Sequence, residues 1–226
     1  IVHSKMPKRY NRVKAGERVT TILFPLLTLV LLFTLQLIWR NNCGYCFSDV
    51  KMFYGQRFLD GTHQFPYLPF QAVSGLKPID HAIEYPVLTG FVMWAYSFLV
   101  PSYDIYRLAN DESFRPEIIY ANINSIFSLI LLIIAAIIIW KLTNSRFVWF
   151  FTLTPTLYFS SLTNFDMWAV TSSLVSLYFL KNSRWKLGAC FLAASISFKF
   201  YPIFIFFLLL IAVWKKLGMK IATSLR

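Results

Sequence analysis

Asp49 is the residue of this sequence whose type and position best suit acid–base chemistry. It lies in Phe47-Ser48-Asp49-Val50-Lys51, directly after the first long apolar run. The chain has 10 acidic residues against 22 basic ones, and few of the acids border apolar segments. A carboxylate that is ionised at neutral pH can act as a general base. The structural alternative is an acid that caps a helix, or lies at headgroup level, and pairs with Lys51.

Four further polar residues interrupt or border apolar runs. Lys199 lies in an apolar stretch, where burying an ionisable side chain in a membrane is costly and therefore indicates a function. The alternative is that its ammonium snorkels to the membrane interface. Asp166 and Asn164 either contribute to a site or cap the helix that begins near Met167. Glu84 enters another apolar run, either as a surface acid or as a residue that orients a substrate hydroxyl.

Several other chemistries lack their motifs. His3, His63 and His81 are isolated, with no His-x-x-x-His or Asp-x-Asp spacing, so we expect no tight metal site. No Gly-rich phosphate loop and no Gly-x-Ser-x-Gly elbow occurs, so a nucleotide-using site is unsupported and no cofactor is expected. Cys43 and Cys46 form a C-x-x-C without a second pair, which predicts either a local disulfide or two free thiols.

The composition is that of a membrane protein. Of the 226 residues, 57% are hydrophobic and 14% charged, and the mean hydropathy is +0.56. Soluble domains carry about 25% charged residues. The net charge of +12 would suit nucleic acid, but basic residues crowd the N-terminus before the first apolar run. This pattern places the N-terminus in the cytoplasm and makes membrane lipids, not nucleic acid, the expected partner.

The hydropathy pattern predicts an all-α, multispanning integral membrane protein with about six to seven membrane helices, several of them short or broken. The first run, Val19–Trp39, is too long for a signal-peptide core and is expected to remain as a transmembrane helix. The later apolar runs are Val87–Val100, Ile118–Trp140, Phe147–Leu162, Met167–Leu180, Leu187–Phe198 and Ile203–Trp214. Short helices that meet at polar points inside a membrane are tolerated where they line a buried or wet cavity.

This pattern divides the chain into five parts. They are a basic cytoplasmic tail (1–18), the first transmembrane helix (19–39), an extracytoplasmic loop (40–86), a membrane helix bundle (87–214) and a second basic cytoplasmic tail (215–226). Because the chain does not begin with Met and stops soon after its last apolar run, a fragment of a longer protein is also expected.

The loop is predicted to carry a short helix over Ser48–Leu59, capped by Ser48 and lying in the membrane interface. Its apolar side comprises Val50, Phe53, Tyr54 and Phe58.

Basic connections set the expected topology. The connections at Lys141–Arg146 and Lys181–Lys186 contain no acid, and neither does the C-terminal tail, so all three are expected in the cytoplasm. The turns at Asn164–Asp166 and Lys199–Pro202 then face the same side as Asp49. Residues 87–100 must in that case form a re-entrant segment, unless they span fully and one basic connection is assigned to the wrong side.

Four motifs occur in order along the chain. They are Phe47-Ser48-Asp49-Val50 followed by Tyr54 and Arg57, Glu84-Tyr85-Pro86-Val87-Leu88-Thr89-Gly90, Thr163-Asn164-Phe165-Asp166-Met167-Trp168-Ala169-Val170, and Lys199-Phe200-Tyr201-Pro202. Together they resemble the multispanning GT-C glycosyltransferases of bacteria, in the branch of polyprenyl-phosphate-mannose-dependent alpha-mannosyltransferases. The resemblance covers Val19 to Trp214, and members of that family are usually longer.

The resemblance implies an inverting, metal-independent hexosyltransferase. It would move a hexose, expected to be mannose, from a polyprenyl-phosphate sugar to a glycolipid or glycan acceptor on the outer side of the cytoplasmic membrane. In that fold an acid of the first outer loop is the general base, and Asp49 occupies that position. Lys199, with Arg57 second, would meet the charge of the leaving phosphate. Asp166 or Glu84 would hold sugar hydroxyls, and the other implied substrate-binding residues are Asn164, Tyr85, Tyr54 and Tyr201.

Two other interpretations stay open. One is a non-catalytic membrane transporter or flippase, in which Lys199 and Asp166 form a charge pair along a translocation path. The other is a truncated, inactive glycosyltransferase fragment. An enzyme needs Asp49 and Lys199 to face one outward-open cavity, whereas a transporter would more naturally show pseudo-symmetric halves.

Overall fold

Helices form the described part of the chain. The computed structural model describes residues 15–44, 46, 48–56, 85–101, 115–143, 147–209, 211 and 214, and no strand occurs among them. The all-α prediction is confirmed. Two helical segments of this part, Thr21–Asn42 and Pro116–Thr143, are long and apolar enough to cross a membrane. The larger number of spans stays a prediction.

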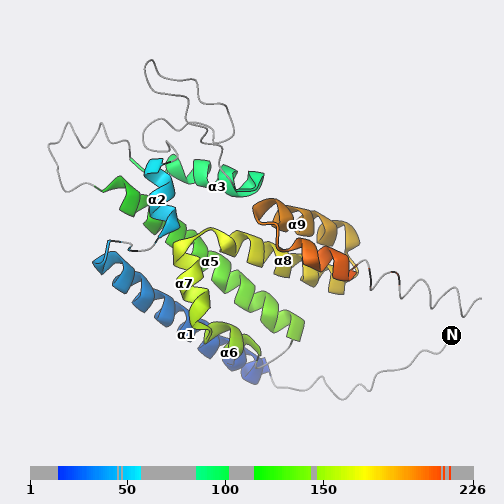
Figure 1. Ribbon diagram of the computed structural model, residues 1–226. Helices are drawn as coiled ribbons and strands as arrows, with labels where there is room; N and C mark the ends of the chain where they lie inside the picture. Colours follow the sequence, from blue (N-terminus) through cyan, green and yellow to red (C-terminus); the bar gives the residue numbers. More distant parts are fainter. Residues whose placement is uncertain are drawn as a thin grey trace, which may run out of the picture.

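The two long helices, α1 (Ala15–Asn42) and α5 (Pro116–Thr143), lie side by side and antiparallel (Figure 1). At about 1.5 Å per residue, each is about 42 Å long, enough to cross a hydrocarbon core of about 30 Å. Leu29 and Phe33 of α1 are buried in one cluster with Leu132 of α5. The other side of α1 is apolar and exposed, which suits contact with lipid. The exposed residues of that side include Leu23, Phe24, Leu27, Leu31, Leu35 and Ile38.

The apolar run 147–162 is broken into α6 (Phe147–Thr152) and α7 (Pro155–Thr163). Pro155 stands at the start of α7, where it lacks an N–H and its ring clashes with the preceding turn. The Tyr158 hydroxyl donates to the Thr152 carbonyl across the break. A carbonyl freed by the break is thereby satisfied inside the bundle, as an apolar surrounding requires.

Helices α8 (Asp166–Lys181) and α9 (Trp185–Phe198) form a hairpin held together through small residues. The Ser195 hydroxyl donates to the Ala169 carbonyl at 2.7 Å, and the Ser176 hydroxyl donates to the Gly188 carbonyl at 2.7 Å. A Cβ at Gly188 would lie 2.6 Å from Leu180 Cγ. The absence of a side chain at Gly188 therefore makes room for the Leu180 side chain between the two helices.

Two short helices lie at one end of the bundle (Figure 1). They are α2 (Asp49–Gln56) and α3 (Val87–Ser97). With 11 residues, α3 is about 16 Å long, too short to cross a hydrocarbon core of about 30 Å. Residues 87–100 were predicted either to form a re-entrant segment or to span the membrane fully. The length of α3 fits the re-entrant alternative.

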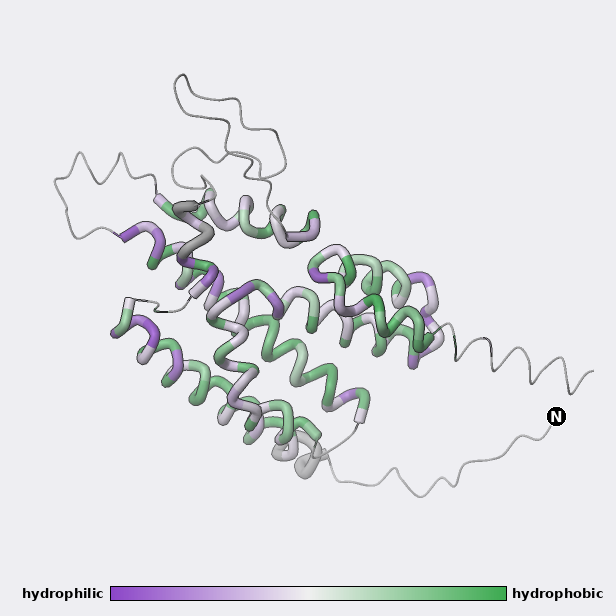
Figure 2. The backbone as a smooth tube through the Cα atoms, in the orientation of Figure 1, coloured by the Kyte–Doolittle hydropathy of each residue, from purple (hydrophilic) through white to green (hydrophobic). Residues whose placement is uncertain are grey.

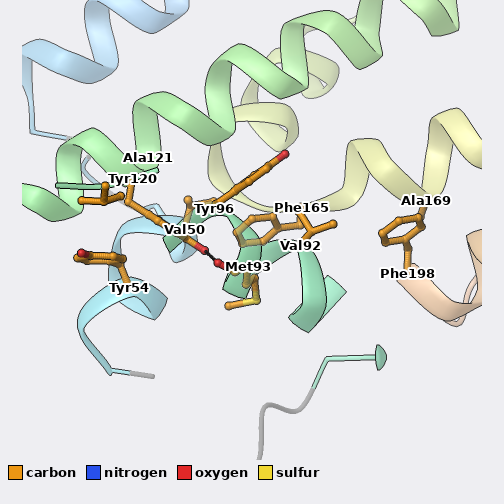
Figure 3. Close-up of a cluster of buried hydrophobic side chains, with 11 residues drawn as sticks. Val50, Tyr54, Val92, Met93, Tyr96, Tyr120, Ala121, Phe165, Ala169 and Phe198 are labelled. Atoms are coloured by element: carbon orange, nitrogen blue, oxygen red, sulfur yellow. Dashed lines mark hydrogen bonds between the residues drawn. The ribbon is translucent and has the colours of Figure 1, made fainter. Parts of the chain in front are cut away.

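The position of α2 corrects one prediction. Val50 and Tyr54 were expected to face the membrane interface, but both are buried in a cluster with Tyr120 and Ala121 of α5 (Figure 3). The Ser48 hydroxyl, expected to cap α2, donates to the Leu162 carbonyl at 3.4 Å. The pattern of apolar residues was detected correctly, but the surface that it covers is protein and not lipid. Phe53 and Phe58 have no described side chain.

Hydrophilic residues lie at both ends of the bundle, with mostly apolar helix between them (Figure 2). The Lys181 ammonium donates to the Leu142 carbonyl, so the connections after α5 and α8 lie together at one end. The turns that contain Asn164 and Lys199 lie at the opposite end with α2, as the charge pattern predicts. Which side of a membrane each end faces stays a prediction.

We expect Gly188→Leu to destabilise the chain by about 1–3 kcal/mol, because the new side chain would push α8 and α9 apart. Thermal unfolding of the detergent-solubilised chain, followed by circular dichroism, measures this. Ala189→Leu is the matched control, since residue 189 is exposed. Equal unfolding temperatures for the two variants would contradict the close packing described for this hairpin.

Candidate functional site

Lys199 and Asp166 form the centre of the candidate site. The Lys199 Nζ lies 3.0 Å from Asp166 Oδ1, and the two side chains are only 22% and 25% exposed. Asp166 is the first residue of α8, and Lys199 directly follows the last residue of α9. An acid at a helix N-terminus and a base at a C-terminus each match the local helix dipole. The hairpin geometry therefore brings together two charges that are 33 residues apart in sequence.

Asp166 has further polar neighbours. The Ser160 hydroxyl donates to Asp166 Oδ2 at 3.2 Å, and the Asp166 backbone N–H donates to Asn164 Oδ1 at 2.9 Å. The Asn164 carbonyl accepts from Asn124 Nδ2 at 3.5 Å. Asn164 is thus the C-cap residue of α7, and the N-cap of α8 is Phe165, so the predicted side-chain cap is not found. The carboxylate of Asp166 has about four acceptor positions and these contacts use two, which leaves capacity for a ligand hydroxyl.

The ring of Tyr85 covers Lys199. The Lys199 Nζ lies 4.5 Å from the ring centroid, which is a cation–π contact. The Thr89 hydroxyl donates to the Phe198 carbonyl and fastens α3 to the end of α9. Partial burial of Tyr201, which stays 46% exposed, and, second, the nearby Asp166 carboxylate raise its pKa to about 12. The Tyr201 hydroxyl is therefore protonated at neutral pH and available as a hydrogen-bond donor.

Asp49 is exposed in the first turn of α2. It borders the buried cluster in which α2 packs against Tyr120 and Ala121 of α5. Its neighbour Val50 belongs to that cluster, together with Phe165 and Phe198, which precede Asp166 and Lys199 (Figure 3). Each of the three charged residues is thus next in sequence to a member of this one buried cluster.

The alternative in which Asp49 pairs with Lys51 is not found among the ion pairs of the described residues. The Lys51 ammonium donates to the Gly44 carbonyl at 2.8 Å, and the ion pairs in the described part of the chain are Lys199–Asp166 and Arg115–Glu117. The Asp49 carboxylate is thus left exposed to solvent at the helix N-terminus.

Of three other predicted site residues, the structure describes Tyr54. Tyr54 is buried, and its ring centroid lies 4.8 Å from that of Tyr120, so it packs in the core. Arg57 and Glu84 lie outside the described residues.

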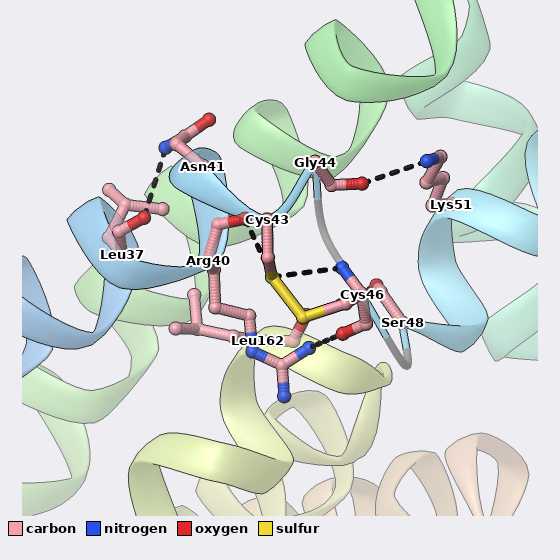
Figure 4. The surroundings of a disulfide bond; sticks show 9 residues. All are labelled: Leu37, Arg40, Asn41, Cys43, Gly44, Cys46, Ser48, Lys51 and Leu162. Carbon is pink, nitrogen blue, oxygen red and sulfur yellow. Dashed lines mark hydrogen bonds between the residues drawn. A yellow bond between two sulfur atoms is a disulfide. The ribbon is translucent and has the colours of Figure 1, made fainter.

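A tether fixes the segment between α1 and α2 (Figure 4). Cys43 and Cys46 form a disulfide, which is the first of the two predicted alternatives, and are not free thiols. The fully buried Arg40 donates to the Cys46 carbonyl at 3.0 Å, and its guanidinium lies 4.8 Å from the ring centroid of Phe159 in α7. Together with the Lys51–Gly44 bond, these contacts hold the start of α2, and so Asp49, against the bundle.

Sequence analysis did not identify Arg40, Ser160 or Trp168 as neighbours of this region. The Trp168 indole stacks on Phe198 at a centroid distance of 5.4 Å and donates to the Tyr96 hydroxyl at 3.1 Å. The only sequence signal for Arg40 was its position at the end of an apolar run. Basic residues that snorkel to a membrane interface have the same position.

Comparison with models of protein families, with curated proteins and with solved structures finds no match to this chain.

We expect Lys199→Met and Asp166→Leu each to destabilise the chain, because each leaves a partly buried charge without its partner. The double variant should recover stability, giving a coupling of roughly 1–3 kcal/mol in a double-mutant cycle. Chemical unfolding in detergent measures the four free energies. Additive effects would contradict the ion pair.

We expect an alkylating reagent to label the denatured, unreduced chain once, at Cys190, and the reduced chain at all three cysteines. Mass spectrometry counts the labels. The Cys190→Ser variant is the control and should take up no label before reduction and two after it. Full labelling without reductant would show that Cys43 and Cys46 are free thiols.

Proposed function

We propose that this chain is a membrane glycosyltransferase that transfers a hexose from a polyprenyl-phosphate sugar to a glycolipid or glycan acceptor. The observation that carries the proposal is the shared cluster next to Asp49, Asp166 and Lys199. An exposed carboxylate and a partly buried ammonium at one end of apolar helices suit a donor dissolved in the membrane. Mannose as the sugar, and the outer face of the cytoplasmic membrane as the location, rest on the motif resemblance.

In the proposed reaction, the Asp49 carboxylate takes the proton of an acceptor hydroxyl. The acceptor oxygen attacks the anomeric carbon of the donor, the bond from that carbon to the phosphate oxygen breaks, and the electron pair leaves with polyprenyl phosphate. The anomeric configuration inverts. The exposure of Asp49 supports this role, because a general base must reach the hydroxyl within hydrogen-bond distance.

Lys199 is the proposed cation for the leaving phosphate. An ammonium has three N–H donors, and the contact with Asp166 occupies one of them. Lys199 can thus be held in place by Asp166 and Tyr85 while it donates to a phosphate oxygen. Positive charge fixed where negative charge develops is among the strongest sources of catalysis. Arg57 is the second candidate for this role.

The sugar would be held by the remaining groups of the site. Asp166 has spare acceptor positions for hydroxyls, and Glu84 is the alternative acid. The rings of Tyr85 and Tyr201 are the candidates for contact with a sugar face. Asn164 acts through Asp166, since its side-chain oxygen accepts from the Asp166 N–H.

The Lys199–Asp166 ion pair also favours a second candidate, a non-catalytic transporter or flippase. In that case the pair would open and close as a charged headgroup passes, and Asp49 would have no chemical role.

We expect Asp49→Asn to lower sugar transfer by at least about 100-fold, because an amide cannot accept the proton. The measurement is transfer of radiolabelled mannose from polyprenyl-phosphate mannose in membranes that contain the chain. Glu117→Gln is the matched control, since Glu117 is another acid in the first turn of a helix and pairs with Arg115. It should retain activity.

Normal transfer by Asp49→Asn would overturn the assignment of the base. No transfer by the wild-type chain, together with lipid movement that Lys199→Met blocks, would favour the transporter.

A further inference from the structure

Four exposed basic side chains gather at the end of the bundle opposite the candidate site. They are Lys141, Lys181, Arg184 and Lys186, which we call the basic face. The Lys181 ammonium donates to the Leu142 carbonyl, and Lys141 Nζ lies 5.7 Å from the ring centroid of Tyr178. These contacts join the end of α5 to the end of α8. The charges therefore form one surface and not separate patches.

No acid balances this surface among the side chains that the structure describes. Those acids are Asp49, Glu117 and Asp166, which lie at the starts of α2, α5 and α8, at the opposite end. The ion pairs formed in the described part of the chain involve no member of the basic face. The charge of this face is therefore directed at something other than these acids.

Helix electrostatics explain only half of the basic face. Lys141 and Lys181 lie in the last turns of α5 and α8, where cations suit the helix dipole. Arg184 and Lys186 lie at the start of α9, where cations oppose the dipole. These two residues weaken their own helix slightly, which indicates that their charge serves contact with an external anion.

The basic face directly borders exposed apolar surface. Trp185, between the two basic residues, is 56% exposed, and Leu187 and Phe147 next to the connections are also exposed. Tryptophan and basic residues at the edge of an apolar surface are typical of the level of lipid headgroups. In a membrane, the nearest anion is then a lipid phosphate.

We propose that the basic face binds the headgroups of anionic phospholipids. This inference requires membrane insertion but does not depend on glycosyl transfer. A lysine or arginine near a charged membrane surface contributes about fivefold to binding of anionic lipid at low salt. The loss of Arg184 and Lys186 together should therefore reduce the preference of the basic face for anionic over zwitterionic lipid by at least about tenfold, allowing for screening by salt.

The test uses the full chain reconstituted in vesicles of phosphatidylcholine mixed with phosphatidylglycerol, with either lipid brominated. The fluorescence of Trp185 is obtained as the difference between the chain and its Trp185→Phe variant. Stronger quenching by brominated phosphatidylglycerol is expected, and it should weaken as salt is added. Arg184→Gln/Lys186→Gln should lose the preference, whereas Arg184→Lys should keep it.

Arg115→Gln is the control for loss of a basic charge elsewhere, since Arg115 is exposed just before α5, at the opposite end of the bundle. It should leave the quenching ratio of Trp185 unchanged. Equal quenching by both lipids in the wild-type chain would overturn the proposal and leave an acidic soluble partner as the alternative. A preference for phosphatidylglycerol that added salt does not weaken would also overturn the proposal. This salt test needs only the wild-type chain, so it holds even if the double variant fails to insert.

Discussion

The ion pair between Lys199 and Asp166 is the contact on which the functional end of this molecule depends. It joins Asp166, the first residue of α8, to Lys199, which directly follows α9, and the Tyr85 ring lies over the Lys199 ammonium. Removing two charges from water costs several kcal/mol per ion, which attraction between the charges only partly offsets. Ser160, Asn164 and the Tyr85 ring supply the further contacts that make such a pair tolerable at low exposure.

The rest of the bundle is shaped by the need to satisfy backbone groups away from water. Side chains of one helix repeatedly donate to carbonyls of another: Thr171 to Leu131, Ser176 to Gly188, and Tyr120 to Met93. In a membrane, such bonds would fix neighbouring helices without the hydrophobic driving force that water provides, since lipid is as apolar as the side chains. The same requirement explains why the break at Pro155 is bridged by the Tyr158 hydroxyl.

These constraints produce two chemically distinct ends. One end carries acids, the disulfide tether and the aromatic residues around Lys199, and the other carries exposed cations without a described acid beside them. An end that holds an ion pair against apolar helices suits a ligand with a charged headgroup and an apolar tail. The proposed polyprenyl-phosphate donor and the proposed anionic lipids both have this character, and they would be bound at opposite ends.

The sequence by itself determined the helical class, the positions of the apolar runs and the clustering of polar turns. Each of these follows from the local periodicity of apolar residues and the placement of Lys and Arg. It also identified Lys199, Asp166 and Tyr85 as site candidates. Only the tertiary structure decided that Lys199 pairs with Asp166, that Tyr54 belongs to the core, and that α2 packs on α5 instead of lipid. An apolar stripe shows that a helix face is buried but not which surface buries it. The partners of Arg40 and Ser160 likewise depend on how distant helices meet.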